Sequence, residues 1–199
     1  MPSTALPHST PPGRTPSKVA RAIRALSIDR RGAAAVEFAL ISSMLICTIL
    51  FIMTVGVILY MNQALDYATS KAARQVMTGS VQKSGTNQSD FRTQVLCPYL
   101  PAAMSCNDVI VNVQSSITAQ PGWYSSFVRR DLRGLTIPTL ANGSAQYDTG
   151  VQQSYVYMQV IYPITFLPSF LANVLGGATY NGSPAYLAMS TAAFRNEQY

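Results

Sequence analysis

The sequence predicts an α+β protein in which one long N-terminal helix precedes a small antiparallel sheet with short helices. A charge-free apolar run extends from Phe38 to Tyr60, and an apolar stripe at helical spacing continues it to Val76. Alternating apolar residues then mark strands at 109–113 and 151–162. We therefore expect a leader at 1–32, a helix at 33–79 and an α+β domain at 80–199, with the sheet packed on the helix.

The leader, residues 1–32, carries most of the net charge. Six basic residues and one acidic residue precede Gly32, which gives +5 of the total +6. This bias predicts a cytoplasmic leader and a periplasmic domain under the positive-inside rule, and no nucleic-acid partner. The proline-rich part, 1–17, is expected to be disordered. Residues 18–28 fit either a basic helix on the anionic leaflet or a solvated linker.

The apolar run is long enough to cross a bilayer, whose core needs about 20 apolar residues in a helix. We expect a single pass through a bacterial inner membrane, with the lipid bilayer as a partner. A removable signal peptide is the main competitor, but its apolar region is shorter, about 7–15 residues. The helix should continue to Thr78, since Thr78-Gly79-Ser80 supplies a stop.

Glu37 is an acidic residue at the start of this run. It could lie in the headgroup zone, or it could gain about 0.3–1 kcal/mol from the helix dipole in the first turn. A third interpretation uses the spacing, because Gly32, four residues, Glu37 and the aromatic Phe38 form the pattern read by prepilin peptidases. Cleavage would then fall between Gly32 and Ala33.

The same region resembles a known family. Arg31-Gly32-Ala33-Ala34-Ala35-Val36-Glu37-Phe38, the apolar run, Gln63–Ala68 and Ala72–Arg74 are similar to TadE-like proteins, minor pilin-like (pseudopilin) components of Flp/Tad pilus assembly. The resemblance covers about residues 31–79, and Phe194-Arg195-Asn196-Glu197 followed by an aromatic recurs at the C-termini of such proteins. A proline that the family often carries within the run is replaced here by Ser42-Ser43.

This resemblance implies a role in assembling a Flp/Tad type IV pilus, which serves adhesion and surface attachment. The implied partners are a prepilin peptidase, other Tad pilins and inner-membrane assembly proteins. After cleavage, the amine of Ala33 would lie about 6 Å from Glu37 along the helix, within reach of the carboxylate of the same or a neighbouring subunit. The alternative function is a permanently anchored periplasmic binding or sensor protein that is not processed. The mass of the mature N-terminus separates the two.

The three cysteines are expected to differ by location. Cys97 and Cys106 fall in the part predicted to be periplasmic, where disulfides persist. A bridge between them would close a short loop and stabilise the folded domain by about 2.5–3 kcal/mol. The alternative is two free buried thiols. Cys47 lies in the apolar run, where we expect a packing role. No metal site is expected, because the only histidine is His8, in the leader.

The sequence offers no recognisable catalytic constellation. It has no phosphate-binding glycine loop, nucleophile elbow or paired-histidine motif, and one histidine in the leader excludes a Ser-His-Asp site in the domain. A carboxylate dyad assembled by folding is left open. Basic residues around Asp131 predict a solvated surface, with a contact for an acidic partner as the alternative. We expect no enzyme, no cofactor and no small-molecule substrate.

Short elements should follow the long helix in the domain. The expected order is a helix at 90–100, a strand at 109–113, an irregular stretch at 121–150 with a turn at Asn142-Gly143, a strand at 151–162, a helix from Pro168 to Gly176 and a strand at 185–194. Trp123, Tyr124 and Phe127 should cover part of the core.

Overall fold

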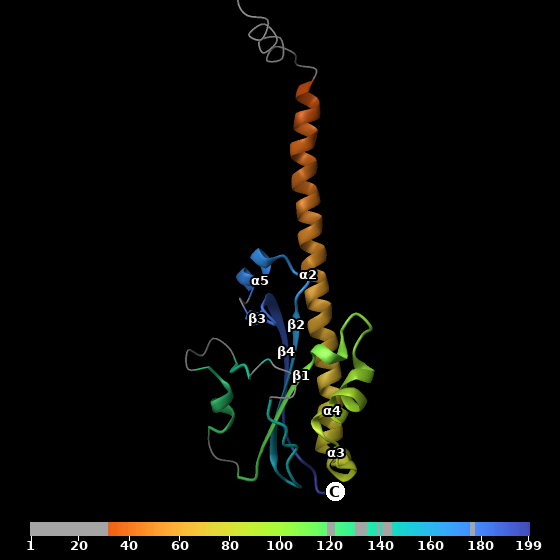
Figure 1. Ribbon diagram of the computed structural model, residues 1–199, viewed down its shortest axis with the longest axis vertical. Coiled ribbons are helices and arrows are strands. Elements are labelled where there is room, and N and C mark those ends of the chain that lie inside the picture. The colour runs from red at the N-terminus through yellow and green to blue at the C-terminus, as the bar shows by residue number, and fades with distance from the viewer. Residues whose placement is uncertain (1–31, 119–121, 130–134, 139, 141–144, 176–177) are drawn as a thin grey trace, which may run out of the picture. The chain divides into compact units, whose positions relative to one another are not determined.

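The structure is a computed structural model, and it describes residues 32–118, 122–129, 135–138, 140, 145–175 and 178–199. The chain divides into two units, Met1–Met53 and Thr54–Tyr199, which are treated separately below. The predicted leader up to residue 31, the Asn142-Gly143 turn and the cluster around Asp131 lie outside the described residues. The predicted fold class is confirmed: a long apolar helix precedes an antiparallel sheet and short helices (Figure 1).

Helix α2 extends from Ala33 to Met77 without interruption. It ends one residue before the predicted position, because Gly79 adopts a left-handed backbone with φ of 77°. In the first unit, every described residue except Ser42 is exposed. Among the described residues, α2 is the one helix long and apolar enough to cross a membrane.

The sheet in the second unit has four antiparallel strands in the order β1-β2-β4-β3. The strands are β1 (Ile110–Ser116), β2 (Tyr155–Ile164), β3 (Ala178–Tyr180) and β4 (Ser183–Arg195). The three predicted strands are confirmed with shifted ends. Strand β2 begins later than predicted because Gln153 has a φ of 62°, which interrupts extended backbone. Strand β3 is an addition, joined to β4 by a two-residue turn.

One face of the sheet packs on the second half of α2. The predicted helical stripe is fully confirmed, since all its members are buried: Met61, Leu65, Ala68, Ala72 and Val76. They share one core with the alternating residues predicted on the strands, Val109, Val111, Val113, Val156, Met158, Val160 and Tyr162. Two alanines in the stripe allow the helix backbone to approach the sheet closely.

Short helical segments follow α2: α3 (Ser80–Ser84), α4 (Gln88–Asp90), a π-helix (Phe91–Leu96) and 3₁₀ turns at Cys97–Tyr99 and Cys106–Asp108. The helix predicted at 90–100 is therefore three consecutive pieces of different pitch. Its predicted inward residues are correct, because Phe91, Val95 and Leu96 are all buried. Helix α5 (Ser169–Leu175) begins directly after Pro168, as predicted.

The opposite face of the sheet has a smaller core built on Ile110, Ile161 and Leu187. A 3₁₀ turn at Tyr124–Phe127 lies on this side, and the Phe127 ring stacks on Tyr157 at a centroid distance of 4.0 Å. Trp123 contacts Phe127 edge-on at 5.2 Å. Of the three predicted aromatic residues, Phe127 is buried and Tyr124 is exposed.

Candidate functional site

The residues singled out for cleavage and recognition lie together at the start of α2. Gly32 directly precedes the helix, Ala33 is its first residue, and Glu37 and Phe38 follow within the next turn. All four are exposed, Phe38 by 73%. A Cβ added at Gly32 would meet nothing within 4 Å, so packing within the described chain does not require a glycine here.

Polar side chains in the apolar part of α2 satisfy themselves on the helix backbone. The Ser42 and Ser43 hydroxyls donate to the carbonyls of Ala39 and Leu40, at 3.1 and 2.9 Å. Thr48 donates to a carbonyl one turn earlier at 2.8 Å. In hydrocarbon an unpaired hydroxyl would be costly, so these internal bonds suit a lipid-facing helix.

Cys47 is a free, exposed thiol on this segment. Because the thiol is exposed within the described chain, its predicted packing role in a membrane stays a prediction.

The second half of α2 carries an exposed polar side opposite its buried stripe. The Lys71 ammonium lies 5.3 Å from the centre of the Tyr67 ring, and Tyr67 contacts Tyr99 edge-on at 6.2 Å. A groove runs between this side of the helix and the segment Pro98–Pro101. The segment is held by the predicted disulfide between Cys97 and Cys106, which the structure confirms, with Cα atoms 5.7 Å apart.

The C-terminal motif closes onto the end of α2. Asn196 is 3% exposed, and its side-chain amide donates to the carbonyls of Thr149 and Val151 at 2.9 and 3.0 Å and to the Ser154 hydroxyl at 3.2 Å. The next residue donates its backbone N–H to the Met77 carbonyl at 2.9 Å. This motif therefore fixes the tail to the last turn of the helix.

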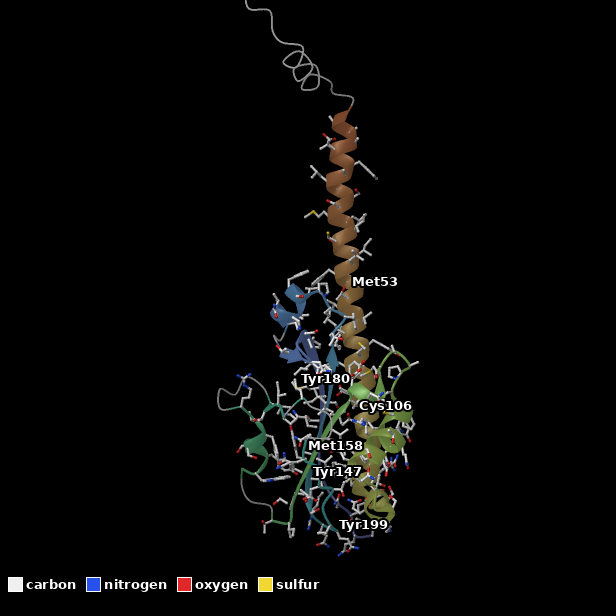
Figure 2. All side chains as sticks on the ribbon, viewed as in Figure 1. Met53, Cys106, Tyr147, Met158, Tyr180 and Tyr199 are labelled. Atoms are coloured by element: carbon white, nitrogen blue, oxygen red, sulfur yellow. A yellow bond between two sulfur atoms is a disulfide. The ribbon has the colours of Figure 1, made fainter. Side chains whose placement is uncertain are left out.

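The terminal ring completes this closure. A Cβ at Gly79 would overlap the Tyr199 ring, so any larger residue there would force the ring to move. The Lys83 ammonium lies 5.2 Å from the centre of the same ring. Figure 2 shows Tyr199 at one end of the domain and Tyr180 toward the other. The resemblance pointed to the motif, but its partners lie far away in sequence and were not predicted.

The described residues contain no group of three histidine, cysteine, aspartate or glutamate side chains that could hold a metal ion. Burial, helped by the negative charge of Asp90, raises the pKa of Tyr147 to about 12. The Tyr147 hydroxyl donates to the Thr86 carbonyl at 3.1 Å and its ring contacts Phe91 at 5.6 Å. Its role is thus to hold a loop against the core.

In the described part of the chain, these features define a class: proteins with an apolar helix of membrane-spanning length whose second half packs into the core of an α+β domain. Residues 32–74 match the family model of the TadE-like protein, which confirms the resemblance over this part of the chain. The match begins at Gly32 and ends at Arg74, so it covers the exposed residues predicted for cleavage and recognition and most of the buried stripe. Curated proteins and solved structures give no significant match.

Proposed function

We propose that this protein is a TadE-like minor pilin, or pseudopilin, that takes part in assembly of a Flp/Tad type IV pilus. The observation that carries the proposal is the family match, which starts at Gly32, directly before an exposed apolar helix with Glu37 as its fifth residue. Pilin-like subunits need such a helix twice, first as a membrane anchor and then as a packing element between subunits. A role in adhesion follows from the pilus rather than from any site on this chain.

The proposed location is the bacterial inner membrane, with a cytoplasmic leader and a periplasmic domain. The net charge of +5 before Gly32 favours this orientation. The bridge between Cys97 and Cys106 supports it, because disulfides persist outside the reducing cytoplasm. The mature domain would therefore fold in an oxidising compartment.

Prepilin peptidase is the proposed processing enzyme, and it would cut between Gly32 and Ala33 on the cytoplasmic side. Since nothing in the described chain crowds a Cβ at Gly32, a Gly32→Leu variant should fold normally and yet block cleavage. Gly56→Leu is the matched control, because Gly56 lies within the helix that Gly32 precedes, with equally open surroundings but outside the cleavage pattern. The measurement is the intact mass of each protein purified from membranes.

We expect the native protein and the Gly56 variant to begin at Ala33, and the Gly32 variant to keep its leader. A native protein that keeps residues 1–32 would instead support the alternative, a permanently anchored periplasmic binding or sensor protein. Normal maturation of the Gly32 variant would place the cleavage site elsewhere.

Glu37 is proposed to pair with the new amine of Ala33, in its own subunit or in a neighbour. One helical turn separates the two residues, about 6 Å along the axis. An unpaired carboxylate in a low-dielectric environment is strongly disfavoured, whereas a paired one is much less so, so the pair would draw an incoming subunit into register. Phe38 next to it supplies the aromatic part of the recognition pattern.

Glu37→Gln tests this role, with Glu197→Gln as the control for loss of an exposed carboxylate elsewhere. The Glu37 variant should still be cleaved but should lower the number of pili on cells, while the control should leave both unchanged. Cleavage together with normal piliation in Glu37→Gln would remove the pairing role and leave Glu37 as a helix-start residue.

A further inference from the structure

Four exposed apolar side chains form a patch on and beside α5, called the α5 patch below. Its members are Phe166, Phe170, Val174 and Leu175, exposed by 60%, 67%, 80% and 45%. Phe170 and Val174 lie four residues apart, on one side of the helix. The opposite side of this segment is anchored in the core through Leu167 and Ala172, both buried. The segment is therefore apolar on both sides, with apolar residues facing the core and apolar residues facing the outside.

The α5 patch lies at the end of the domain where α2 enters it. Leu167 and Ala172 belong to the same core as Ile58, near the start of the second unit, and Phe166 lines a small cavity with Met61. Figure 1 shows α5 beside this part of α2, at the other end of the domain from α3. The tail that carries Tyr199 lies at that opposite end (Figure 2).

The length of the apolar run indicates where the α5 end of the domain lies relative to the bilayer. About 20 helical residues cross the hydrocarbon core, so a span that begins at Phe38 ends near Val57. Leu59 and Tyr60 then lie at the interface, where amphipathic aromatic rings such as tyrosine are favoured, and both are exposed. Phe166 lines a cavity with Met61, which directly follows Tyr60, and Figure 1 shows α5 beside this part of α2, so the α5 patch lies near this level.

The charge pattern favours lipid over a charged protein surface. No charged residue occurs between Asp148 and Arg195, a stretch that includes β2, α5 and β3 and most of β4. Phenylalanine, valine and leucine at an interface bury their apolar surface in the boundary between headgroups and acyl chains. The exposed side of α5 thus offers apolar side chains in a stretch of chain that carries no charge.

We propose that the α5 patch inserts into the headgroup–acyl boundary of the bilayer that α2 crosses, and so holds the domain against the membrane as a second contact. This inference rests on the proposed membrane location of α2. In the pilus precursor the domain would then sit on the membrane surface, with its C-terminal end pointing away from the bilayer.

The test places a polarity-sensitive fluorophore at single cysteines in the full chain, reconstituted in phosphatidylcholine–phosphatidylglycerol vesicles. Native Cys47, the free exposed thiol of the apolar run, reports on α2 itself. In a Cys47→Ser background, Val174→Cys reports on the patch and Val151→Cys serves as the matched control, an exposed valine next to the C-terminal closure. Phe170→Cys is a second patch reporter should Val174→Cys fold poorly.

Nitroxide-labelled lipids and aqueous iodide then report contact with lipid and with water. We expect a shallow nitroxide to quench the patch reporter and iodide to leave it bright, while the Val151 control shows the reverse. Cys47 should be quenched by a nitroxide deep in the acyl chains. If Cys47 is quenched but the patch reporter behaves like the Val151 control, the α5 contact with the membrane is overturned, while α2 is still shown to cross it.

Two further outcomes also overturn the proposal. Loss of quenching at Cys47 itself would remove the membrane location, and the α5 contact with it. A patch reporter that is shielded from iodide only at high protein density, without lipid quenching, would identify a second copy of this chain as the occupant.

Discussion

Replacing Asn196 by alanine should destabilise the domain by about 2 kcal/mol. The side-chain amide has two hydrogens, which it shares among three acceptors, so it supplies the equivalent of two hydrogen bonds. Leaving a buried acceptor without its donor costs about 1.5 kcal/mol, or about 3 kcal/mol for the two. Against this, its Oδ1 atom is buried and accepts no hydrogen bond from the described residues, so its removal recovers about 1 kcal/mol. For a domain of roughly 150 residues, the net loss lowers the melting temperature by about 6 °C.

The assay is thermal unfolding of the full chain in detergent, followed by near-ultraviolet circular dichroism, which reports tertiary packing around the aromatic residues. Gln198→Ala is the control, because Gln198 is exposed and lies in the same tail. Asn196→Asp should be worse than the alanine variant at neutral pH, because it turns an acceptor toward the carbonyls of Thr149 and Val151. Its deficit should shrink near pH 3, where the acid is protonated and can donate.

An Asn196→Ala variant that melts within 1 °C of the Gln198 control would show that the amide does not stabilise the domain. Water would then replace its hydrogen bonds at no net cost in free energy. Equal melting of the aspartate variant at both pH values would show that the side chain leaves this position.

The remaining predictions concern a turn, the disulfide and a tyrosine. Gly79→Ala should destabilise the domain more than Gly85→Ala in the same assay; each costs about 1–2 kcal/mol for its left-handed backbone, but only the first also displaces the terminal tyrosine ring. Removing the bridge by Cys97→Ser with Cys106→Ser should cost about 2.5 kcal/mol, and a reductant should then no longer change the melting temperature. Because the folded pKa of Tyr147 is about 12 against an ordinary tyrosine pKa of 10.0, the unfolded chain releases this proton first, so stability falls as pH rises between these values. Tyr147→Phe should reduce that fall in urea unfolding compared at roughly pH 9 and pH 11.5, and an unchanged pH dependence would contradict the assignment.

Helix α2 was predictable because its signals are local. A charge-free run and a stripe at helical spacing are both read within a few turns, and Gly79 supplies the stop. The strands were predictable from alternation, but their ends were not, because the turn at Gln153 shows no strong local signal. Strand β3 is only three residues long, which is too short to show any alternation.

The candidate site divides in the same way. The residues from Gly32 to Phe38 were found from spacing and from the resemblance, since their pattern is continuous in sequence. The structural role of Asn196 could not be predicted from the sequence, because its hydrogen-bond partners lie 42 to 47 residues away. The α5 patch was likewise missed, because exposure of an apolar side chain depends on which other elements cover it.

The position of β4 inside the sheet has a consequence for how the molecule is made. A ribosome releases the chain N-terminus first, so the apolar stripe of α2 and the β1–β2 pair emerge before the strand that completes the sheet. Until β4 arrives, β2 has an unpaired edge, which is prone to join the edge of another chain. Newly made molecules thus pass through an interval in which they are prone to aggregate, and a chaperone that shields β2 until β4 is made would raise the yield of folded protein.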